Sequence, residues 1–389
     1  MTGRRTFLGS AASGLLILKP ETVFGSQANS AIELGIIGAG GRGIWIGGLF
    51  KEHTLTHLAA YADPFQDRLD LASQKLGVES SRLYKGINGY QELLASKVDA
   101  VAIESPAYFH PEQVSAALAA GKHIYLAKPL AVDVAGCKSI LASGDKAKGK
   151  ISFLADFQSR VRPMFQEAAR RVHAGDIGTP VIGQVFYHTG RLQRKDKPGA
   201  SEAENRLRNW SFDKTLSGDI IVEQNIHVID MGNWFLQGHP VSAIGTGGRK
   251  GRIDVGDAWD HFIVTFDYPN GVKVAFSSGQ FTKGYNILCA RIYGTGGTLD
   301  SHYGGYIRIT GDKPWPGTEK DDTFVGGAVT NVKSFTDSIR TGQYVNNIPE
   351  SIESNLTAIL GRMAAYQQKT VTWDEMMRSN EKLEANLKL

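Results

Sequence analysis

The feature that most constrains this chain is a glycine-rich turn between an apolar run and a helical run. The segment Gly38-Ala39-Gly40-Gly41-Arg42-Gly43 follows the buried-strand pattern of residues 34–37 and has the spacing G-x-G-x-x-G. Gly38 permits a tight turn, Gly40 lets a pyrophosphate approach the backbone, and Gly43 lets the helix pack closely on the strand. The helix that the motif opens, predicted through residues 44–51, directs its N-terminus at the phosphates. The sequence therefore predicts a dinucleotide site.

An acidic residue lies where such a site needs one. Asp63 follows the strand-like run 58–62 and comes twenty residues after Gly43. A carboxylate at the end of the second strand binds ribose hydroxyls and repels a 2′-phosphate. We therefore expect NAD as the cofactor. Arg42 could offset that repulsion, which leaves NADP as the alternative.

The order of elements predicts two sheets of different kinds. Before residue 150, strand-like runs alternate with helical runs, which predicts βαβ units and a parallel sheet. After residue 150, longer β-rich runs are separated by turn signals such as Pro269-Asn270-Gly271, as in an antiparallel sheet. An apolar helical segment, 219–236, interrupts them. We expect a signal peptide at 1–28, a cofactor domain at 32–150, a sheet domain at 151–331, and a helical end at 332–389 that packs back on the body.

Composition excludes several other classes of protein. Hydrophobic residues make up 42% and charged residues 21% of the 389 residues, which suits a globular chain with a sizeable core. The net charge of +4 falls to +2 without residues 1–28, so no electrostatic footprint for nucleic acid or an anionic membrane is present. Cys137 and Cys289 are too few for a disulfide scaffold, and we expect both to be buried thiols.

The N-terminus has the pattern of an export signal. Arg4-Arg5-Thr6-Phe7-Leu8 precedes the uncharged run 9–18, and the small residues Ser26 and Ala28 follow. Paired arginines in this setting resemble the twin-arginine signal. The apolar run is too short to cross a bilayer, and no longer one follows. We therefore expect a periplasmic protein with no membrane insertion after cleavage of the signal.

A lysine at the end of the fourth strand is the first candidate for the reaction itself. Ala127-Lys128-Pro129 follows the strand-like run 123–126, at the sheet edge where ligands of parallel sheets bind. Beside a nicotinamide, Lys128 with a lowered pKa can accept a hydroxyl proton or bind the developing oxyanion. Spacing alone leaves a solvated surface lysine as the alternative. Pro129 holds its neighbour in an extended conformation.

A second group of polar residues lies within the apolar helical segment. Glu223, His227 and Asp230 follow the spacing i, i+4, i+7 and would share one face of a continuous helix. Polar groups in such surroundings are costly unless they are paired or functional. His227 can transfer a proton near neutral pH, and Glu223 would orient it. A buried histidine with satisfied hydrogen bonds is the alternative. No metal site is expected: His53 and His57 match i, i+4 but have no third ligand.

Together, these motifs resemble one family, the glucose–fructose oxidoreductase and inositol dehydrogenase (Gfo/Idh/MocA) family, from about residue 32 onward. The resemblance rests on several segments: 38–43, 105–110, 127–129, 158–160, 218–230 and 292–299. It implies an α/β fold in which an N-terminal Rossmann parallel sheet is followed by an α+β domain with a large open, mostly antiparallel sheet. It also implies NAD(P) as cofactor and a homo-oligomer, either a dimer or a tetramer.

The resemblance also assigns roles to individual residues. It implies Lys128 beside the nicotinamide, His227 as the acid–base group and Glu223 in the place of an aspartate. Ser105, Pro106 and His110 would line the nicotinamide side of the cleft, while Gln158, Arg160 and Asp230 would face the substrate. The chain departs from the family at Ala127, where the motif carries glutamate, and at Glu223, which is one methylene longer than aspartate.

A loop before the His227 segment is a candidate for sugar binding. Residues 193–205 are polar and predict an exposed loop, and Asn209 and Trp210 follow it. A tryptophan beside hydrogen-bonding groups suits a sugar ring, although packing of the loop explains Trp210 equally well. The substrate class, a sugar or cyclitol, comes from the family resemblance.

Three hypotheses about function follow. The first is NAD(P)-dependent interconversion of a secondary alcohol and a ketone on a sugar, glycoside or cyclitol, with the cofactor held tightly because free NAD is scarce outside the cytoplasm. The second is a redox-neutral glycosidase that oxidises, eliminates, adds water and reduces again. The third is a nucleotide-binding protein without catalysis.

Overall fold

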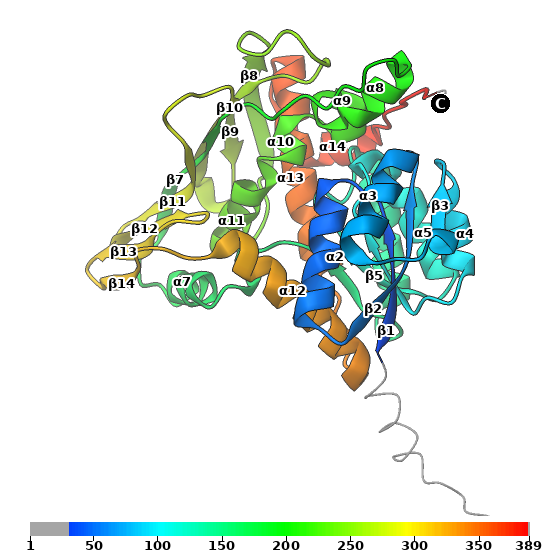
Figure 1. The fold of residues 1–389 in the computed structure, drawn as a ribbon. Coiled ribbons are helices and arrows are strands. Elements are labelled where there is room, and N and C mark those ends of the chain that lie inside the picture. Colours follow the sequence, from blue (N-terminus) through cyan, green and yellow to red (C-terminus); the bar gives the residue numbers. More distant parts are fainter. Residues whose placement is uncertain (1–30, 388–389) are drawn as a thin grey trace, which may run out of the picture.

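A computed structural model describes residues 31–387 of the chain. The predicted export signal at 1–28 lies outside these residues. Two sheets of different construction stand side by side in Figure 1, and two long helices near the C-terminus lie between and beneath them. The expected fold class, a Rossmann sheet followed by a mostly antiparallel sheet domain, is confirmed.

The first sheet is parallel throughout, with the strand order β3-β2-β1-β4-β5-β6. This is the strand order of dinucleotide-binding domains, in which the direction of winding reverses between β1 and β4. Its strands are β1 (Ile32–Ile37), β2 (Thr56–Asp63), β3 (Leu83–Lys85), β4 (Ala100–Ile103), β5 (His123–Leu126) and β6 (Phe153–Ala155). Its helices are α2 (Gly41–His53), α3 (Gln66–Leu76), α4 (Gly89–Ala95), α5 (His110–Ala119) and α6 (Val134–Ala147).

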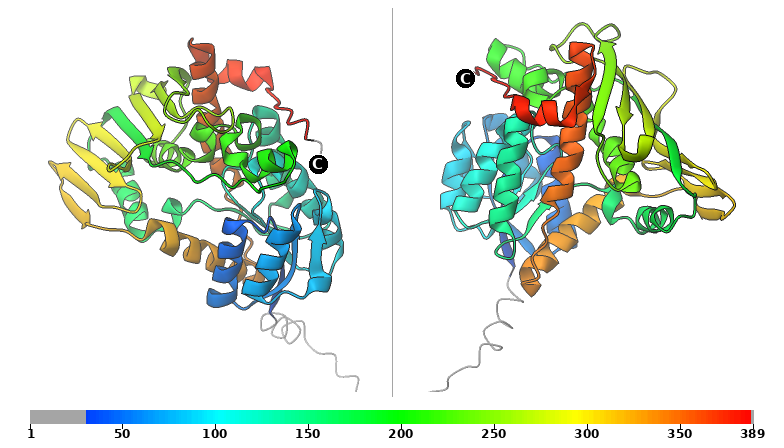
Figure 2. Two further views of the ribbon diagram at one scale, coloured as in Figure 1. Left: turned by 45° about the horizontal axis from the view of Figure 1, so that its top comes forward. Right: turned by 180° about the vertical axis from the view of Figure 1, so that it is seen from behind.

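The central strands of this sheet are apolar because helices cover both faces. All four residues of β4 are fully buried, so it lacks the alternation of a half-exposed strand. The ligand edge is the edge where these strands end, and the turns after β1, β2, β4 and β5 meet there. That edge faces the second half of the molecule in Figure 2.

The second sheet has nine strands in the order β14-β13-β12-β11-β7-β10-β9-β8-β15. Neighbouring strands are antiparallel except β7 and β10, which run parallel. The strands are β7 (Pro180–Thr189), β8 (Ser242–Gly248), β9 (His261–Asp267), β10 (Lys273–Gln280), β11 (Ile287–Gly294), β12 (Gly297–His302), β13 (Ile307–Gly311), β14 (Trp315–Thr318) and β15 (Val371–Thr372). In β9, buried Phe262, Val264 and Phe266 alternate with exposed neighbours, so one face of the sheet packs inward.

The remaining helices connect the two sheets. They are α7 (Pro163–His173), α8 (Glu202–Arg208), α9 (Lys214–Ser217), α10 (Ile220–Glu223), α11 (Ile226–Leu236), α12 (Thr323–Thr341), α13 (Ile348–Gln367) and α14 (Trp373–Ser379). Helix α12 lies along α2 in Figure 1 and adds Val332 and Phe335 to the core under the first sheet. Helix α13 packs on α6 and on β8, so residues far apart in sequence tie the two halves together.

The apolar segment 219–236 is not the continuous helix that the sequence predicts. Helix α10 ends at Glu223 and α11 begins at Ile226. The carbonyl of Ile220 accepts hydrogen bonds from the N–H groups of both Gln224 and Asn225, which widens the last turn and interrupts the helix. Glu223 and His227 therefore belong to different helices, and the i, i+4 argument for their pairing does not hold.

The polar loop expected at 193–205 is exposed for much of its length, as predicted, but it has a defined course. We call residues 190–213 the bridging segment: it leaves β7, crosses to the first sheet and includes α8. Both cysteines are buried thiols, as expected. Within residues 31–387, no helix is both long and apolar enough to span a membrane.

Candidate functional site

A cleft runs along the ligand edge of the first sheet and is closed from the other side by residues of the second half. One end holds the glycine turn and Asp63, and the other end holds Lys128, Glu223 and His227. The lining residues that the sequence predicted are Gly38, Gly40, Gly41, Arg42, Asp63, Ser105, Pro106, Lys128, Trp210, Glu223 and His227. A single cavity thus joins the predicted cofactor site to the predicted reaction centre.

The glycine turn has the shape that a pyrophosphate requires. Gly38 has a φ of +103°, and a side chain there would meet the backbone of Glu104. A Cβ on Gly43 would lie 1.8 Å from the carbonyl oxygen of Gly38, so the close packing of helix on turn needs glycine. At Gly41, which opens α2, the direction of a side chain is free of neighbouring atoms. The cradle therefore fits the dinucleotide cofactor that the motif predicts.

Asp63 braces this turn as well as facing the cleft. One carboxylate oxygen accepts the N–H of Ala39 and the other accepts the N–H of Phe65, both at 2.9 Å. Burial raises the pKa of Asp63, and Arg68, 4.0 Å away, opposes that rise. The carboxylate has the position expected of a ribose ligand at the end of β2.

Arg42 points away from Asp63, towards β4 and β6. Its Nε lies 3.1 Å from the carboxylate of Glu104, and its guanidinium forms an ion pair with buried Asp156. Burial alone would lower the pKa of Arg42, but Asp156 and Glu104 keep it above its ordinary value. Because Arg42 is engaged there, it does not offset the charge of Asp63, and the argument that it would favour NADP loses its basis.

The turn after β4 contributes both lining and structural residues. Ser105 and Pro106 line the cleft, and the Ser105 hydroxyl donates to Gln113 at 2.5 Å. His110 is buried and lies behind the lining, where its two ring nitrogens lie 2.8 Å from the carbonyl oxygen of Ser105 and 3.2 Å from that of Leu130. It therefore ties the turn after β4 to the turn after β5. Pro129 is likewise not among the residues that line the cleft.

Lys128 and Glu223 meet at the far end of the cleft. The Lys128 ammonium donates to the backbone carbonyl of Glu223 at 2.5 Å and lies 3.4 Å from its carboxylate. In a continuous helix, the carbonyl of Glu223 would bind the N–H of His227, so the interruption frees it for Lys128. Burial lowers the pKa of Lys128, and Glu223 partly restores it. Glu223 therefore positions Lys128, whereas we had expected it to orient His227.

His227 lies next to this pair as a neutral base. Its side chain is almost completely buried, lines the cleft and packs on the ring of Tyr303, with ring centroids 4.9 Å apart. Burial lowers the pKa of His227 well below its ordinary value, and the positive charges of Lys128 and Arg42 lower it further. The imidazole is therefore uncharged near neutral pH and can accept a proton.

Three residues expected to face the substrate lie behind the cleft wall. Arg160 holds Asp230 in a two-pronged ion pair of 2.8 to 3.0 Å, and Ser354 donates a further hydrogen bond to the same carboxylate. Gln158 is fully buried between Asp156 and Tyr303. None of Gln158, Arg160 and Asp230 lines the cleft, and the bonds of Asp230 join α11 to Arg160 and to Ser354 on α13.

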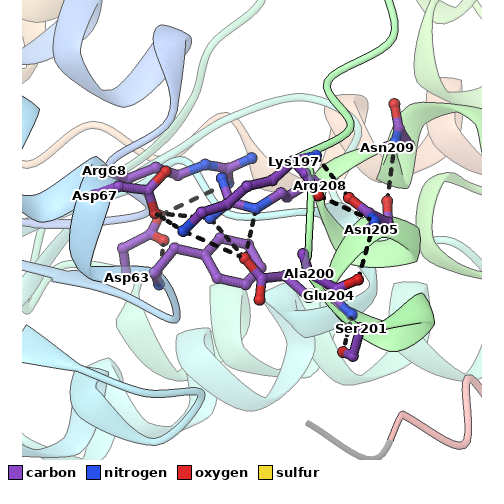
Figure 3. A network of polar contacts seen from close by, with 11 residues as sticks. Asp63, Asp67, Arg68, Lys197, Ala200, Ser201, Glu204, Asn205, Arg208 and Asn209 are labelled. Atoms are coloured by element: carbon purple, nitrogen blue, oxygen red, sulfur yellow. Dashed lines mark hydrogen bonds and ion pairs between the residues drawn. The ribbon is translucent and has the colours of Figure 1, made fainter.

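The bridging segment closes the end of the cleft where the glycine turn and Asp63 lie. Arg208 donates to Asp67 on α3 at 2.7 Å, and Lys197 lies 3.7 Å from the same carboxylate (Figure 3). Trp210 lines the cleft, whereas Asn209 does not: its amide binds Lys195 and Asp196 and holds the segment in shape. Asn209 thus supports the loop.

Sequence reasoning missed several residues of this site. Glu104 and Asp156 hold Arg42, Phe324 of α12 reaches the cleft from the C-terminal half, and Leu192 and Lys195 line it from the bridging segment. The partners of Arg42 are 62 and 114 residues away in the chain, beyond the reach of any local pattern. The one available signal was a charged residue, Glu104, directly after a fully apolar strand.

No metal site is evident in the part of the chain that the structure describes. Among residues 31–387, no group of three or more His, Cys, Asp or Glu side chains is placed to hold a metal ion.

Comparison with known families matches both halves of the molecule. Residues 32–154 match the model described as "Oxidoreductase family, NAD-binding Rossmann fold", and residues 165–300 match the GFO/IDH/MocA C-terminal domain. The chain belongs to the Gfo/Idh/MocA oxidoreductases. Its first domain is an NAD-binding domain, and the resemblance seen in the sequence motifs is confirmed.

Several of the relatives are named as dehydrogenases. Inositol 2-dehydrogenase 3 of Saccharopolyspora erythraea is 26% identical over 69% of this chain and 72% of its own length. The structure of myo-inositol 2-dehydrogenase from Lactobacillus plantarum matches with a TM-score of 0.71 at 20% identity, over 88% of this chain and 99% of that one. Levoglucosan dehydrogenase in complex with NADH and levoglucosan gives the same TM-score and coverage at 18% identity. At such identities, the two structures show that the fold is shared.

Proposed function

We propose that the protein is an NAD-dependent oxidoreductase that interconverts a secondary alcohol and a ketone on a sugar, glycoside or cyclitol. The observation that carries the proposal is the meeting of Lys128, Glu223 and His227 in the same cleft as the glycine turn and Asp63. The names of the relatives, inositol and sugar dehydrogenases, support the substrate class.

NAD⁺, when bound, supplies the hydride acceptor. In the oxidation, the alcohol carbon gives up its hydrogen with both electrons, the hydroxyl gives up its proton, and a carbonyl group forms. The Lys128 ammonium, held by Glu223, donates a hydrogen bond to the substrate oxygen, and neutral His227 accepts the proton. In the reduction, His227 returns the proton.

Aromatic side chains suit a ring-shaped substrate. Trp210 and Tyr187 both line the cleft, Tyr187 on the side of Glu223. The Tyr187 ring can stack on the C–H face of a sugar whose hydroxyls bind the charged groups at the Lys128 end. Trp210 belongs to the bridging segment at the Asp63 end, where it packs against the cluster that contains Phe65 and Leu207. This arrangement supports a sugar or cyclitol over a small hydroxy acid.

The cofactor is retained between turnovers. The bridging segment crosses from the second half onto α3 and places Leu192, Lys195 and Leu207 on the wall of the cleft. Its ion pairs to Asp67 link the two halves beside Asp63, and they must part before a nucleotide can leave by that end. Retention suits a periplasmic enzyme, which the pattern of residues 1–28 favours, because NAD cannot be replenished readily there.

A homo-oligomer is the proposed state in solution. Ile182, Ile244 and Ile263, on three strands of the second sheet, are 45–59% exposed. Apolar side chains on an open sheet face favour contact with another chain. Light scattering of the purified protein is the check, and a monomer at all concentrations would contradict this state.

Two experiments test the proposed function. Mass spectrometry of the supernatant of the denatured protein identifies any nucleotide that co-purifies, and NAD is expected. Absorbance of NADH is then followed after addition of inositols, hexoses and their glycosides, with and without added NAD⁺. Failure of every compound to reduce the cofactor would contradict the proposal. The comparisons do not favour the redox-neutral glycosidase, for which release of p-nitrophenol from a nitrophenyl glycoside would be the signature.

A further inference from the structure

The family motif carries a glutamate at the position of Ala127. In this chain, a different carboxyl group, that of Glu104, lies directly beside that position. Strands β4 and β5 run parallel with Ile103 opposite Leu126, and the N–H of Ala127 donates to the carbonyl of Ile103 at 3.0 Å. The next residue along β4 is Glu104, so Glu104 and Ala127 are neighbours at the same edge of the sheet. The glutamate missing at 127 has a counterpart one strand away.

The surroundings of Glu104 satisfy its carboxyl group only in part. Its side chain is fully buried and the residue lines the cleft. Apart from Arg42, whose Nε lies 3.1 Å from one carboxylate oxygen, neither oxygen has a polar partner among the described residues. Its one close cation is Arg42, which also pairs with Asp156. A buried carboxyl with so few partners costs free energy, and such costs are tolerated most often where the group has a function.

The groups that face Glu104 come from four elements around it. They are Arg42 from α2, Asp156 after β6, Lys128 after β5, Tyr61 from β2 and Tyr125 from β5. The two tyrosines are neutral, because burial keeps their pKa values far above the ordinary range. Lys128, Arg42, Asp156 and Glu104 therefore set the charge at this end of the cleft.

We propose that Glu104 supplies, from the neighbouring strand, the carboxylate that Ala127 lacks, and that it is a positioning residue whose charge favours the oxidised cofactor. The inference rests on the proposed function only in assuming that the cleft binds NAD. Oxidised nicotinamide carries a positive charge that the reduced form lacks, so a carboxylate at this end of the cleft stabilises NAD⁺ more than NADH.

The ionisation of Glu104 gives this role a pH dependence. Burial raises the pKa of Glu104 to about 8, and Arg42 opposes that rise. Because NAD⁺ favours the ionised form, its affinity should increase as pH rises through that pKa of about 8, whereas the affinity for NADH should change less.

Calorimetric titration of the protein, stripped of retained nucleotide, with NAD⁺ and with NADH tests the proposal. Glu104→Gln should weaken NAD⁺ binding about tenfold while changing NADH binding by no more than about twofold. The double variant Glu104→Ala, Ala127→Glu should recover NAD⁺ affinity relative to Glu104→Ala alone. Glu92→Gln, an exposed change on α4, is the matched control and should leave both affinities unchanged.

The outcomes separate this inference from the proposed function. Equal losses for NAD⁺ and NADH in Glu104→Gln, or no recovery in the double variant, would overturn the role of Glu104 while leaving the function intact. If the variants do not fold, titration of the unmodified protein still tests the role of Glu104. An NAD⁺ affinity that does not change between pH values below and above 8 would also overturn that role. Failure of the unmodified protein to bind either nucleotide would instead count against the proposed function.

Discussion

The two ends of the cleft are built in opposite ways. At the Asp63 end, the halves of the molecule are joined by ion pairs of Asp67, whose side chain is 47% exposed. One partner, Lys197, is 48% exposed, and the other, Arg208, is 7% exposed. At the reaction end, Lys128 and Glu223 also join the two halves, but their side chains are only 9% and 13% exposed. Contact between the halves is therefore screened by water at one end and shielded from it at the other.

Because of this difference, the Asp63 end is suited to holding the cofactor and the Lys128 end to the reaction. Exposed ion pairs contribute little to stability and weaken with salt, so the bridging segment can open without unfolding either half. Buried charges keep their geometry and have strongly shifted pKa values, as proton transfer requires. Changes at the reaction end should therefore have large effects on turnover, and loss of the ion pairs between the bridging segment and α3 should have small effects on nucleotide release.

The largest effect is expected from Lys128→Met. This variant keeps the length of the side chain but removes the ammonium that binds the substrate oxygen, so kcat should fall about 10³-fold. Binding of NADH, followed by its fluorescence, should stay within about twofold of the unmodified protein. A variant that binds NADH normally and retains full turnover would remove Lys128 from the reaction.

His227→Asn should lower kcat by about 10²-fold, because the proton acceptor is lost. The pH profile provides a second check. The pKa of His227 lies below its ordinary value of 6.5, so the imidazole stays neutral at that pH. As the pH is lowered, the kcat/KM of the unmodified enzyme should therefore stay constant through pH 6.5 and decline only at lower pH. A decline centred above pH 6.5 would contradict a neutral His227 as the base.

Asp63→Asn should weaken NAD⁺ binding by about tenfold to 100-fold, which corresponds to the loss of hydrogen bonds to a charged group. NADP⁺ should bind better to the variant than to the unmodified protein, because the repulsion of its 2′-phosphate is removed. Titration with both nucleotides measures the change. An unchanged preference would show that Asp63 only braces the turn through Ala39 and Phe65.

The smallest effect is expected from Asp67→Asn. Loss of the ion pairs of Asp67, whose own side chain is 47% exposed, with Arg208 and Lys197 should speed NADH release by about twofold to fivefold at low salt, and by less at high salt. Asp70→Asn on the same helix is the matched control, since Asp70 bonds only Gln66 within α3. Equal release rates in the two variants would show that the bridging segment does not retain the nucleotide.

The contrast between the two ends of the cleft also explains which parts of the site could be predicted from the sequence. The glycine turn and Asp63 depend on backbone geometry within one βαβ unit, so their spacing in the chain indicates their place in the fold. The pairing of Lys128 with Glu223 joins residues 95 positions apart and depends on a helix interruption at Gln224 and Asn225. Helical periodicity identified Glu223 and His227 but could not reveal that interruption, so it gave Glu223 the wrong partner.

Burial explains the remaining differences between the predicted site residues and those that line the cleft. Gln158, Arg160 and Asp230 are polar residues in a family motif, and the sequence alone does not distinguish a polar group that faces a ligand from one that bonds another buried group. In the structure, Arg160 satisfies Asp230 completely behind the wall of the cleft. Glu104 is the opposite case: no motif marks it, yet it lines the cleft and Arg42 is its one close polar partner among the described residues.

The central claim is that one cleft both holds NAD and oxidises a ring alcohol. The most direct test is to add inositols and hexoses to the protein as purified, with no nucleotide added, and to follow the absorbance of NADH. We expect one of them to generate about one equivalent of NADH per chain, and Lys128→Met to lose this signal while still containing the nucleotide. A nucleotide-loaded protein that no such compound reduces, with or without added NAD⁺, would contradict it.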